Sequence, residues 1–184
     1  MTIEGMRVAI LVEDEFEDSE LVEPLKALRN AGADVTLVGS GSKRVYSGKK
    51  GHVTVHADTT ASAVHAKDFE AIVIPGGRAP EKMRLHQSMV DLVKEAEAAG
   101  LVIAAVCHGP QLLISAGVVK GRTLTCTPSI AIDVQNAGGN YVDQAVVRDG
   151  NLITSRNPDD LPMFSKTIIE ALEERKARRP QTRA

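Results

Sequence analysis

Cys107 and His108 are the residues in this 184-residue chain best suited to covalent chemistry. They follow the apolar run Val102–Val106, and Gly109 comes directly after them. The next segment, Gln111–Ala116, has the apolar spacing of an amphipathic helix. A nucleophile at such a strand-to-helix corner, with small neighbours two residues away on each side, is typical of a nucleophile elbow. Because the turn is tight and strains the backbone, we predict that Cys107 is a cysteine nucleophile.

Several neighbouring groups could activate this thiol. The start of a helix favours thiolate over thiol, and His108 is a candidate base or proton shuttle. Backbone N–H groups of His108 and of the loop Pro75–Gly77 could form an oxyanion hole. The acidic segment Glu13–Glu20 follows the first apolar run, so one of its carboxylates could hydrogen-bond the thiol. We expect most of these acids to lie in a first helical turn, and Cys126 to be a packing residue.

The elements that must position these groups alternate along the chain. Short apolar runs rich in β-branched residues are typical of strands buried on both faces of a parallel sheet. The four runs are Arg7–Val12, Val35–Val38, Ala71–Ile74 and Leu101–Val106. Helical patterns lie between them, ending near Gly32 and Gly100. This rhythm predicts an α/β fold with right-handed crossovers and ligands at the carboxyl edge of the sheet.

Two stretches interrupt the alternation and predict hairpins. One is 45–56, and the other is 141–155 with a turn at Asp149-Gly150. A final helix is expected from Pro158 to about Glu174, followed by a frayed basic tail over 175–184. The sequence shows no repeat, linker or low-complexity segment. We therefore predict a single domain over residues 1–184.

Composition excludes several classes of function. The net charge is −2, aromatic residues are 3% and tryptophan is absent, so no specific nucleic-acid site is expected. Two cysteines without a C-x-x-C pair give neither a disulfide framework nor a thiol metal site. No signal peptide or long apolar span is evident, which indicates a cytoplasmic protein without a membrane contact.

Weaker motifs indicate neither a cofactor nor a metal. The segment Gly39–Arg44 resembles a dinucleotide loop but lacks the third glycine, so we interpret it as a surface turn. His52, Thr54 and His56 alternate onto one strand face without a third ligand nearby, which favours a polar edge strand. We predict no cofactor and no metal site.

Four segments together resemble a known family. They are Glu15–Asp18 (EFED), Pro75–Glu81 (PGGRAPE), Val106–Ala116 (VCHGPQLLISA) and Ser155–Asp160 (SRNPDD). In this order they are similar to the ThiJ/PfpI superfamily, and specifically to its PfpI-like branch of intracellular protease, protein deglycase and general stress protein homologues. The resemblance covers about residues 6–172. It implies a flavodoxin-like three-layer sandwich with a mostly parallel central sheet and a nucleophile elbow.

The resemblance also implies roles for particular residues. Cys107 would be the nucleophile with His108 as its partner, and Glu17 would be the carboxyl group that contacts the thiol, in its protonated form. Gly77 and His108 would supply the oxyanion-hole amides. Glu81 would reach the His108 of a neighbouring subunit, since homodimers and homohexamers occur in this branch.

One position departs from the family pattern. Relatives often carry Tyr or His where Thr127 aligns. A threonine hydroxyl is shorter and cannot act as a base, so the resemblance does not extend to activities that need the larger ring, including peptide hydrolysis.

Three functions remain open. The first is a cofactor-independent deglycase or glyoxalase III-type enzyme, in which the Cys107 thiolate attacks methylglyoxal or its adducts on protein. The second is an intracellular cysteine peptidase or amidase using Cys107, His108 and Glu81. The third is a non-catalytic sensor of oxidative stress through oxidation of Cys107. A glutamine amidotransferase triad is excluded, because His108 is the last histidine and that triad needs one near the C-terminus.

Overall fold

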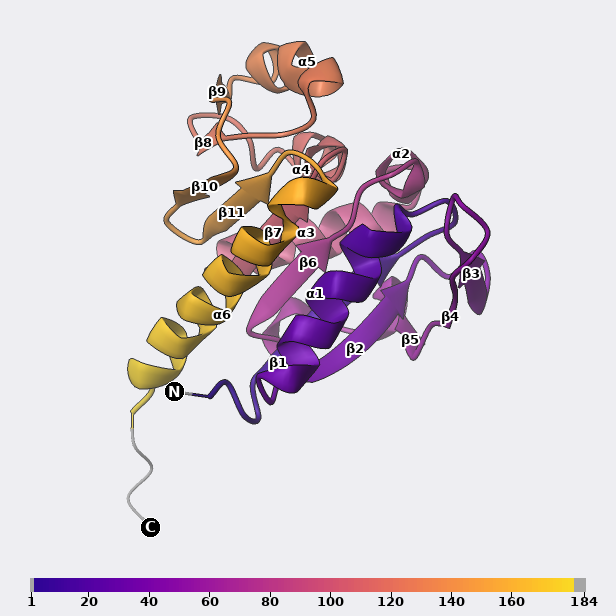
Figure 1. Ribbon diagram of the computed structural model, residues 1–184, viewed down its shortest axis with the longest axis vertical. Helices are drawn as coiled ribbons and strands as arrows, with labels where there is room; N and C mark the ends of the chain where they lie inside the picture. The colour runs from indigo at the N-terminus through magenta and orange to yellow at the C-terminus, as the bar shows by residue number, and fades with distance from the viewer. Residues whose placement is uncertain (1, 181–184) are drawn as a thin grey trace.

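A seven-stranded sheet forms the centre of the computed structural model, which describes residues 2–180 (Figure 1). The strands lie in the order β10-β11-β7-β6-β1-β2-β5, and only β10 is antiparallel to its neighbour. Their bounds are β1 Arg7–Val12, β2 Asp34–Gly39, β5 Thr59–Thr60, β6 Ala71–Ile74, β7 Val102–Val106, β10 Val146–Asp149 and β11 Leu152–Ser155. Every residue of β6 and β7 is buried, so both faces of the sheet are covered.

Helices cover the two faces and make three layers. α1 (Asp18–Asn30) and α6 (Leu161–Ala177) pack side by side on the face toward the viewer in Figure 1. α3 (Gln87–Ala98) packs behind β6 and β7. The shorter helices are α2 (Ala79–Met83), α4 (Pro110–Ser115) and α5 (Ala131–Asn136), and 3-10 turns cover Ala61–Ala63, Ala66–Asp68, Pro128–Ile130 and Pro158–Asp160. The predicted α/β sandwich with a mostly parallel sheet is confirmed.

Both predicted hairpins are present. β3 (Val45–Ser47) pairs antiparallel with β4 (Thr54–His56), and β10 pairs antiparallel with β11 through a turn at Gly150. The second hairpin is shorter than predicted, because β9 (Asn140–Tyr141) pairs instead with β8 (Thr123–Leu124).

The first hairpin is attached to the loop that follows β1. The N–H of Lys49 donates to the carbonyl of Phe16 at 2.9 Å, and the N–H of Glu15 donates to the carbonyl of Ser47 at 2.8 Å. Phe16 is fully buried beneath these bonds. The turn of the hairpin, residues 48–51, is thereby fixed beside the start of α1 (Figure 1).

The basic tail differs from the prediction over its first residues. α6 continues to Ala177 instead of ending near Glu174, and Arg179 forms an ion pair with the buried carboxylate of Glu70. Lys176 donates to the carbonyl of Glu4 at 3.1 Å. Charged side chains thus anchor this end of α6 to the body, so fraying from residue 175 is wrong. Residues 181–184 of the predicted tail lie outside the described residues.

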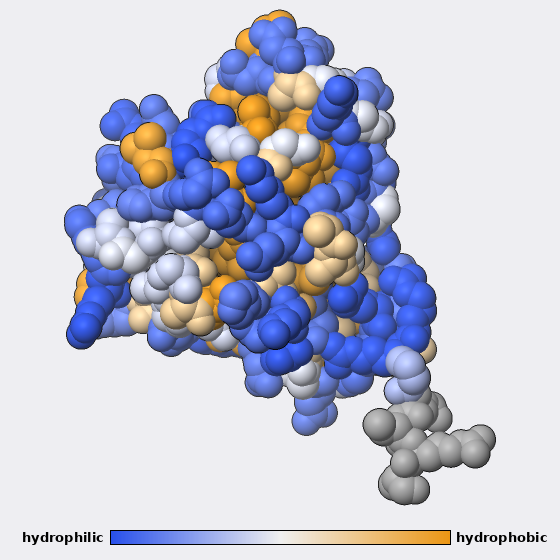
Figure 2. Space-filling model, turned by 180° about the vertical axis from the view of Figure 1, so that it is seen from behind, coloured by the Kyte–Doolittle hydropathy of each residue, from blue (hydrophilic) through white to orange (hydrophobic). Residues whose placement is uncertain are grey.

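The surface seen from behind is mainly hydrophilic, with apolar residues gathered below the lobe that contains α5 (Figure 2). Within residues 2–180, none of the helices combines the length and the apolar character that crossing a membrane requires.

Candidate active site

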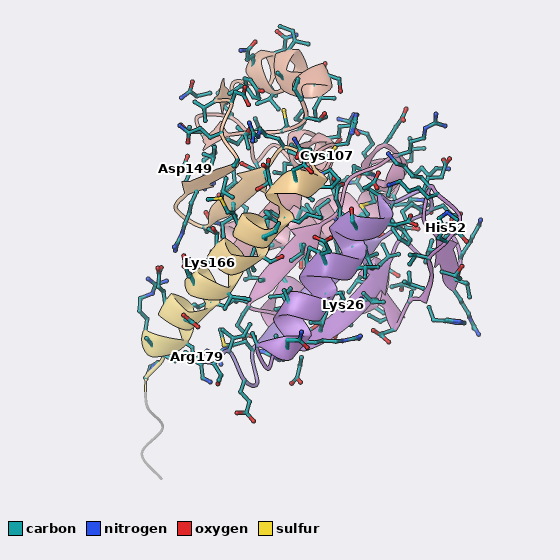
Figure 3. The ribbon with its side chains drawn as sticks, viewed as in Figure 1. Lys26, His52, Cys107, Asp149, Lys166 and Arg179 are labelled. Atoms are coloured by element: carbon teal, nitrogen blue, oxygen red, sulfur yellow. The ribbon has the colours of Figure 1, made fainter. Side chains whose placement is uncertain are left out.

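Cys107 lies at the upper end of the sheet, between the end of β7 and the start of α4 (Figure 3). Its φ angle is 62°, in the left-handed region that non-glycine residues seldom occupy. The N–H of Cys107 donates to the carbonyl of Ser155, and its carbonyl accepts from the N–H of Thr127, both at 3.0 Å. A Cβ atom at Gly109 would lie 2.7 Å from the carbonyl oxygen of Ile74. The strained nucleophile and the need for glycine here are those of the predicted elbow.

A second loop approaches the thiol from the end of β6. The N–H groups of Gly77 and His108 lie close enough to Sγ of Cys107 to lower the pKa of its thiol. Gly77 has a φ of 76°, and a Cβ there would lie 2.5 Å from the carbonyl oxygen of Glu15. Only glycine allows the loop after β6 to lie so close to the loop after β1. The two amides predicted for an oxyanion hole therefore lie near the Cys107 sulfur, and the oxyanion hole itself stays a prediction.

The carboxyl group beside the thiol is Glu20, which corrects the expectation for Glu17. Glu20 is fully buried, accepts the N–H of Gly76 at 2.9 Å and lies close enough to Cys107 for the two groups to shift each other's pKa. Burial, and then the negative charge of Glu17, raise the pKa of Glu20 to about 8. Its carboxyl group is therefore protonated at neutral pH and can donate to the sulfur.

Glu17 points to the first hairpin instead. Its two carboxylate oxygens lie 2.6 Å from Nζ of Lys49 and 3.0 Å from Nζ of Lys50. Burial by itself would raise the pKa of Glu17, but these two ion pairs outweigh it and lower the pKa. The physical reason for the correction is the start of α1. Glu17 is the residue before the helix, whereas Glu20 lies within the first turn on the inward face.

The pKa of the Cys107 thiol is set by opposing effects. Burial, followed by the charge of Glu20, raises it to about 11, while the Thr127 hydroxyl and the amides of His108 and Gly77 lower it. The contribution of Glu20 disappears when that group is protonated. Below pH 8, the hydrogen bonds to sulfur therefore act without the repulsion of a neighbouring carboxylate.

His108 is placed to exchange a proton with the thiol. Its Nδ1 lies 3.4 Å from Sγ of Cys107, and its Nε2 lies 3.4 Å from the hydroxyl of Ser129. Burial and then the charge of Lys49 lower the pKa of His108, while Glu81 opposes them. The His108 imidazole is therefore neutral at pH 7, and the neutral form can accept a proton.

These groups surround one open cleft of about 670 Å³. Its lining residues come from four loops and the starts of α2 and α4: Glu15, Lys49, Lys50, Gly77, Arg78, Glu81, Cys107, His108 and Gln111. Glu81 therefore shares the cleft with His108 in a single chain. The predicted contact with a neighbouring subunit stays a prediction.

Other candidate residues have simpler roles. Cys126 is fully buried in the apolar core, in agreement with the packing interpretation, and burial raises the pKa of its thiol to about 12. The loop Gly39–Arg44 is a turn after β2, as predicted. Across residues 2–180, no three His, Cys, Asp or Glu side chains gather as metal ligands would.

Sequence reasoning missed Glu20 and the two hairpin lysines. A signal for Glu20 was present, because it precedes the buried Pro24 and Leu28 by four and eight residues and so shares their helix face. No comparable signal identifies Lys49 and Lys50. Their position depends on how the hairpin docks on the loop after β1.

Fold and site together define an α/β protein with a cysteine at a strand-to-helix elbow, beside a histidine and a buried carboxyl group whose pKa is raised. The sequence matches the DJ-1/PfpI family over residues 6–171, and the chain belongs to that family.

Named relatives agree with this placement. A deglycase of Pyrococcus abyssi is 45% identical over 91% of this chain and all of its own length. Protein/nucleic acid deglycase 2 of Escherichia coli is 41% identical over 90% of this chain and 97% of its own. General stress protein 18 of Bacillus subtilis is 38% identical over 92% of this chain and 99% of its own. These names support an enzyme of the DJ-1/PfpI family.

Among solved structures, a two-domain Anabaena variabilis protein with DJ-1/ThiJ/PfpI-like and ferritin-like domains superimposes with a TM-score of 0.89 at 45% identity. The match covers 91% of this chain and half of that longer chain. The likeness therefore concerns one of its two domains.

Proposed function

We propose that this protein is a stress-response cysteine enzyme that acts, without a cofactor, on methylglyoxal or on its adducts with protein. The observation that carries the proposal is the convergence of two amides, a neutral imidazole and a protonated carboxyl group on Cys107. The names of the deglycase relatives support the substrate class.

The chemistry follows from these groups. The Cys107 sulfur adds to the aldehyde carbon, and the N–H groups of Gly77 and His108 stabilise the oxygen that gains negative charge. The product is a thiohemiacetal, with the thiol proton transferred to His108. Loss of the proton from the former aldehyde carbon, and gain of one at the neighbouring carbonyl carbon, convert it to a thioester. Water then releases lactate and regenerates the thiol, so methylglyoxal and water give lactate and one proton.

Glu20 is suited to the proton transfers in this sequence. A carboxyl group with a pKa of about 8 can both donate and accept a proton near neutral pH. His108, whose pKa is lowered by burial, accepts the proton of the thiol. No step needs an oxidant, a reductant or a metal, because the reaction is an internal redox isomerisation followed by hydrolysis.

The test compares wild-type protein with Cys107→Ala. Loss of methylglyoxal and formation of lactate are followed together by chromatography. Lactate that depends on Cys107 supports the proposal. Equal lactate from both proteins, or no turnover while the wild-type thiol titrates as reduced, overturns it and favours a peptidase or an oxidation sensor.

Free aldehyde and adduct are distinguished by the order of mixing. Methylglyoxal is equilibrated with N-acetylarginine before enzyme is added. An enzyme that uses free aldehyde clears the adduct no faster than the adduct dissociates by itself. Adduct loss that accelerates in proportion to enzyme concentration indicates direct deglycation.

We also propose that the site is completed in a homodimer or homohexamer, with Glu81 reaching the His108 of a neighbouring subunit. Within a single chain Glu81 lines the cleft and its charge opposes the lowering of the His108 pKa, so the contact between subunits rests on the family resemblance. Mixing inactive Cys107→Ala with impaired Glu81→Gln chains should restore about a quarter of wild-type activity, since half of random dimers then hold one complete site. An active monomer, or no restoration after subunit exchange, contradicts a shared site.

A further inference from the structure

Lys49 and Lys50 line the cleft beside Cys107, and the reaction proposed above gives neither of them a role. Their ammonium nitrogens lie 2.6 and 3.0 Å from the two oxygens of one carboxylate, that of Glu17. The Glu17 side chain is 7% exposed, whereas the lysine side chains are 42% and 58% exposed. The carboxylate is therefore buried beneath two cations that remain accessible from the cleft.

This arrangement gives the lysine pair a net positive charge. Two ammonium groups held by one carboxylate carry a net charge of +1, and they would repel one another without it. Each ammonium group has three N–H donors, and each is paired with only one oxygen of Glu17. Among the described residues, neither lysine has a second carboxylate within ion-pair distance. The pair can therefore donate to an anion that enters the cleft.

The backbone holds the pair in place. The N–H of Lys49 donates to the carbonyl of Phe16 at 2.9 Å, and the N–H of Gly51 donates to the carbonyl of Gly48 at 3.0 Å. These bonds fix the hairpin turn against the loop that follows β1. The cations are thus preorganised instead of free to move with a surface loop, which reduces the entropic cost of binding.

The charge of this pair also reaches the reacting groups. Lys49 lowers the pKa of His108, and the negative charge of Cys107 raises the pKa of Lys49. Lys49 therefore lies close enough to both for direct electrostatic interaction. Because Lys49, Lys50 and Cys107 line the same cleft, a substrate bound at Sγ can extend toward the lysines.

We propose that Lys49 and Lys50, held by Glu17, form an anion subsite that selects α-oxoaldehydes bearing a carboxylate a few bonds from the aldehyde. A net charge of +1 suits a singly charged carboxylate better than a doubly charged phosphate monoester. The selection of carboxylate-bearing substrates rests on the proposed oxoaldehyde reaction. The attraction of anions to the cleft requires only that Cys107 can be alkylated.

The first experiment measures the field at the thiol without any turnover. Cys107 is alkylated with iodoacetate, which is an anion, and with iodoacetamide, which is neutral. Both react with the same thiolate, so the ratio of the two rate constants cancels any change in nucleophilicity. Cys126 is fully buried, and a Cys126→Ala background confines the reaction to Cys107.

For the wild-type protein, the rate constant with iodoacetate divided by that with iodoacetamide should be larger than the same ratio for a small free thiol. Lys49→Gln and Lys50→Gln should each lower this ratio roughly three- to tenfold, because each removes one positive charge from a cleft near the protein surface. High salt should flatten the difference. Lys26→Gln removes the same charge from an exposed position on α1, outside the cleft, and should leave the ratio unchanged (Figure 3). A wild-type ratio equal to that of the free thiol overturns the subsite.

The second experiment compares two five-carbon substrates that differ at one end. 4,5-Dioxopentanoate carries a carboxylate where 2-oxopentanal carries a methyl group. We expect wild-type kcat/KM to favour the anion about tenfold, through KM, and the Lys49→Gln/Lys50→Gln variant to lose this preference. Equal kcat/KM for both substrates in the wild type contradicts selection by the lysines.

The two experiments separate the possible failures. A high alkylation ratio without turnover of either substrate keeps the anion subsite and refutes the oxoaldehyde reaction. Turnover of both substrates with equal kcat/KM, and an alkylation ratio like that of a free thiol, keeps the reaction and refutes the subsite.

Discussion

The titration of Glu20 gives a prediction whose size follows from the structure. Burial and the charge of Glu17 raise the pKa of Glu20 from 4.5 to about 8. In the unfolded chain the carboxyl group titrates near its usual pKa, so between these two pH values the folded protein keeps a proton that the unfolded chain has released. The stability contributed by this proton is fully present below pH 4.5 and is lost as the pH rises to about 8.

The magnitude is large enough to measure. The shift from 4.5 to about 8 spans about 3.5 pH units. At about 1.4 kcal/mol per unit, this corresponds to on the order of 5 kcal/mol across the range. Between pH 5.5 and 7.5, Glu20 should lower the free energy of unfolding by roughly 2–3 kcal/mol.

Glu20→Gln removes this titration and keeps the shape of the side chain and a hydrogen-bond donor for the thiol. The free energy of unfolding is measured by urea titration at half-unit pH steps, at constant ionic strength and with reduced cysteines. The variant should gain stability relative to wild type as the pH rises. Because His108 titrates in both proteins, its contribution largely cancels in the difference.

Glu17→Gln is the matched control. Ion pairs lower the pKa of Glu17, so its carboxylate is charged in the folded and unfolded states above pH 5.5. The variant should be destabilised by an amount that stays nearly constant at the lower end of this range and shrinks toward pH 7.5, because loss of the Glu17 charge also lowers the pKa of Glu20. If the difference between Glu20→Gln and wild type is flat from pH 5.5 to 7.5, Glu20 is ionised in the folded protein and the reasoning fails.

Three further substitutions test separate contacts. Thr127→Val removes a hydroxyl that hydrogen-bonds Cys107, so the midpoint of the alkylation-versus-pH curve should move to higher pH. Gly109→Ala places a Cβ 2.7 Å from a carbonyl oxygen and should lower the free energy of unfolding by roughly 1–3 kcal/mol in urea titrations. Glu70→Gln weakens the ion pairs of a buried carboxylate with two arginines, so the free energy of unfolding should fall by roughly 1–3 kcal/mol. Hydrogen exchange of the backbone amides near the end of α6 should become faster.

The sheet could be predicted from the sequence because its central strands are continuous apolar runs. The bounds predicted for β1 and β6 agree with the structure, those for β2 differ by one residue at each end, and those for β7 differ by one residue at its start. Continuous β-branched runs of this length are typical of strands buried on both faces of a parallel sheet. The end of α6 was harder to predict, because Arg179 meets Glu70 only after the chain has folded back across the sheet edge.

The strand-to-helix elbow at Cys107 could be predicted because local sequence forms it. Which carboxyl group lies beside the thiol could not be predicted. Cys107 depends on its immediate neighbours, so a short motif identifies it. Glu17 and Glu20 stand three residues apart, and which of them faces the thiol depends on where α1 begins. The first residue of a helix is uncertain by one or two positions from sequence alone. Here that uncertainty decides whether Glu17 or Glu20 is assigned to the helix face beside the thiol.

Lys49 and Lys50 could not be predicted as cleft residues, because no local pattern relates them to Cys107. They lie in a hairpin turn whose position is decided by backbone bonds to Phe16 and Glu15. Such long-range docking carries no periodic signal in the sequence. A basic pair in a glycine-rich turn would otherwise be interpreted as a solvated surface.

The two carboxyl groups and the lysines act as one electrostatic unit. The charge of Glu17 raises the pKa of Glu20, and the charge of Lys49 lowers it. Replacing Lys49 therefore removes a cation from the cleft and also favours the protonated form of Glu20, which contacts the thiol. A change in kcat/KM for one substrate cannot separate these effects, since both follow from the same lost charge. Comparing an anionic with a neutral reagent at the same thiol does separate them at a pH well below 8, because Glu20 is then protonated already in the wild type and only the charge of the lysine is lost.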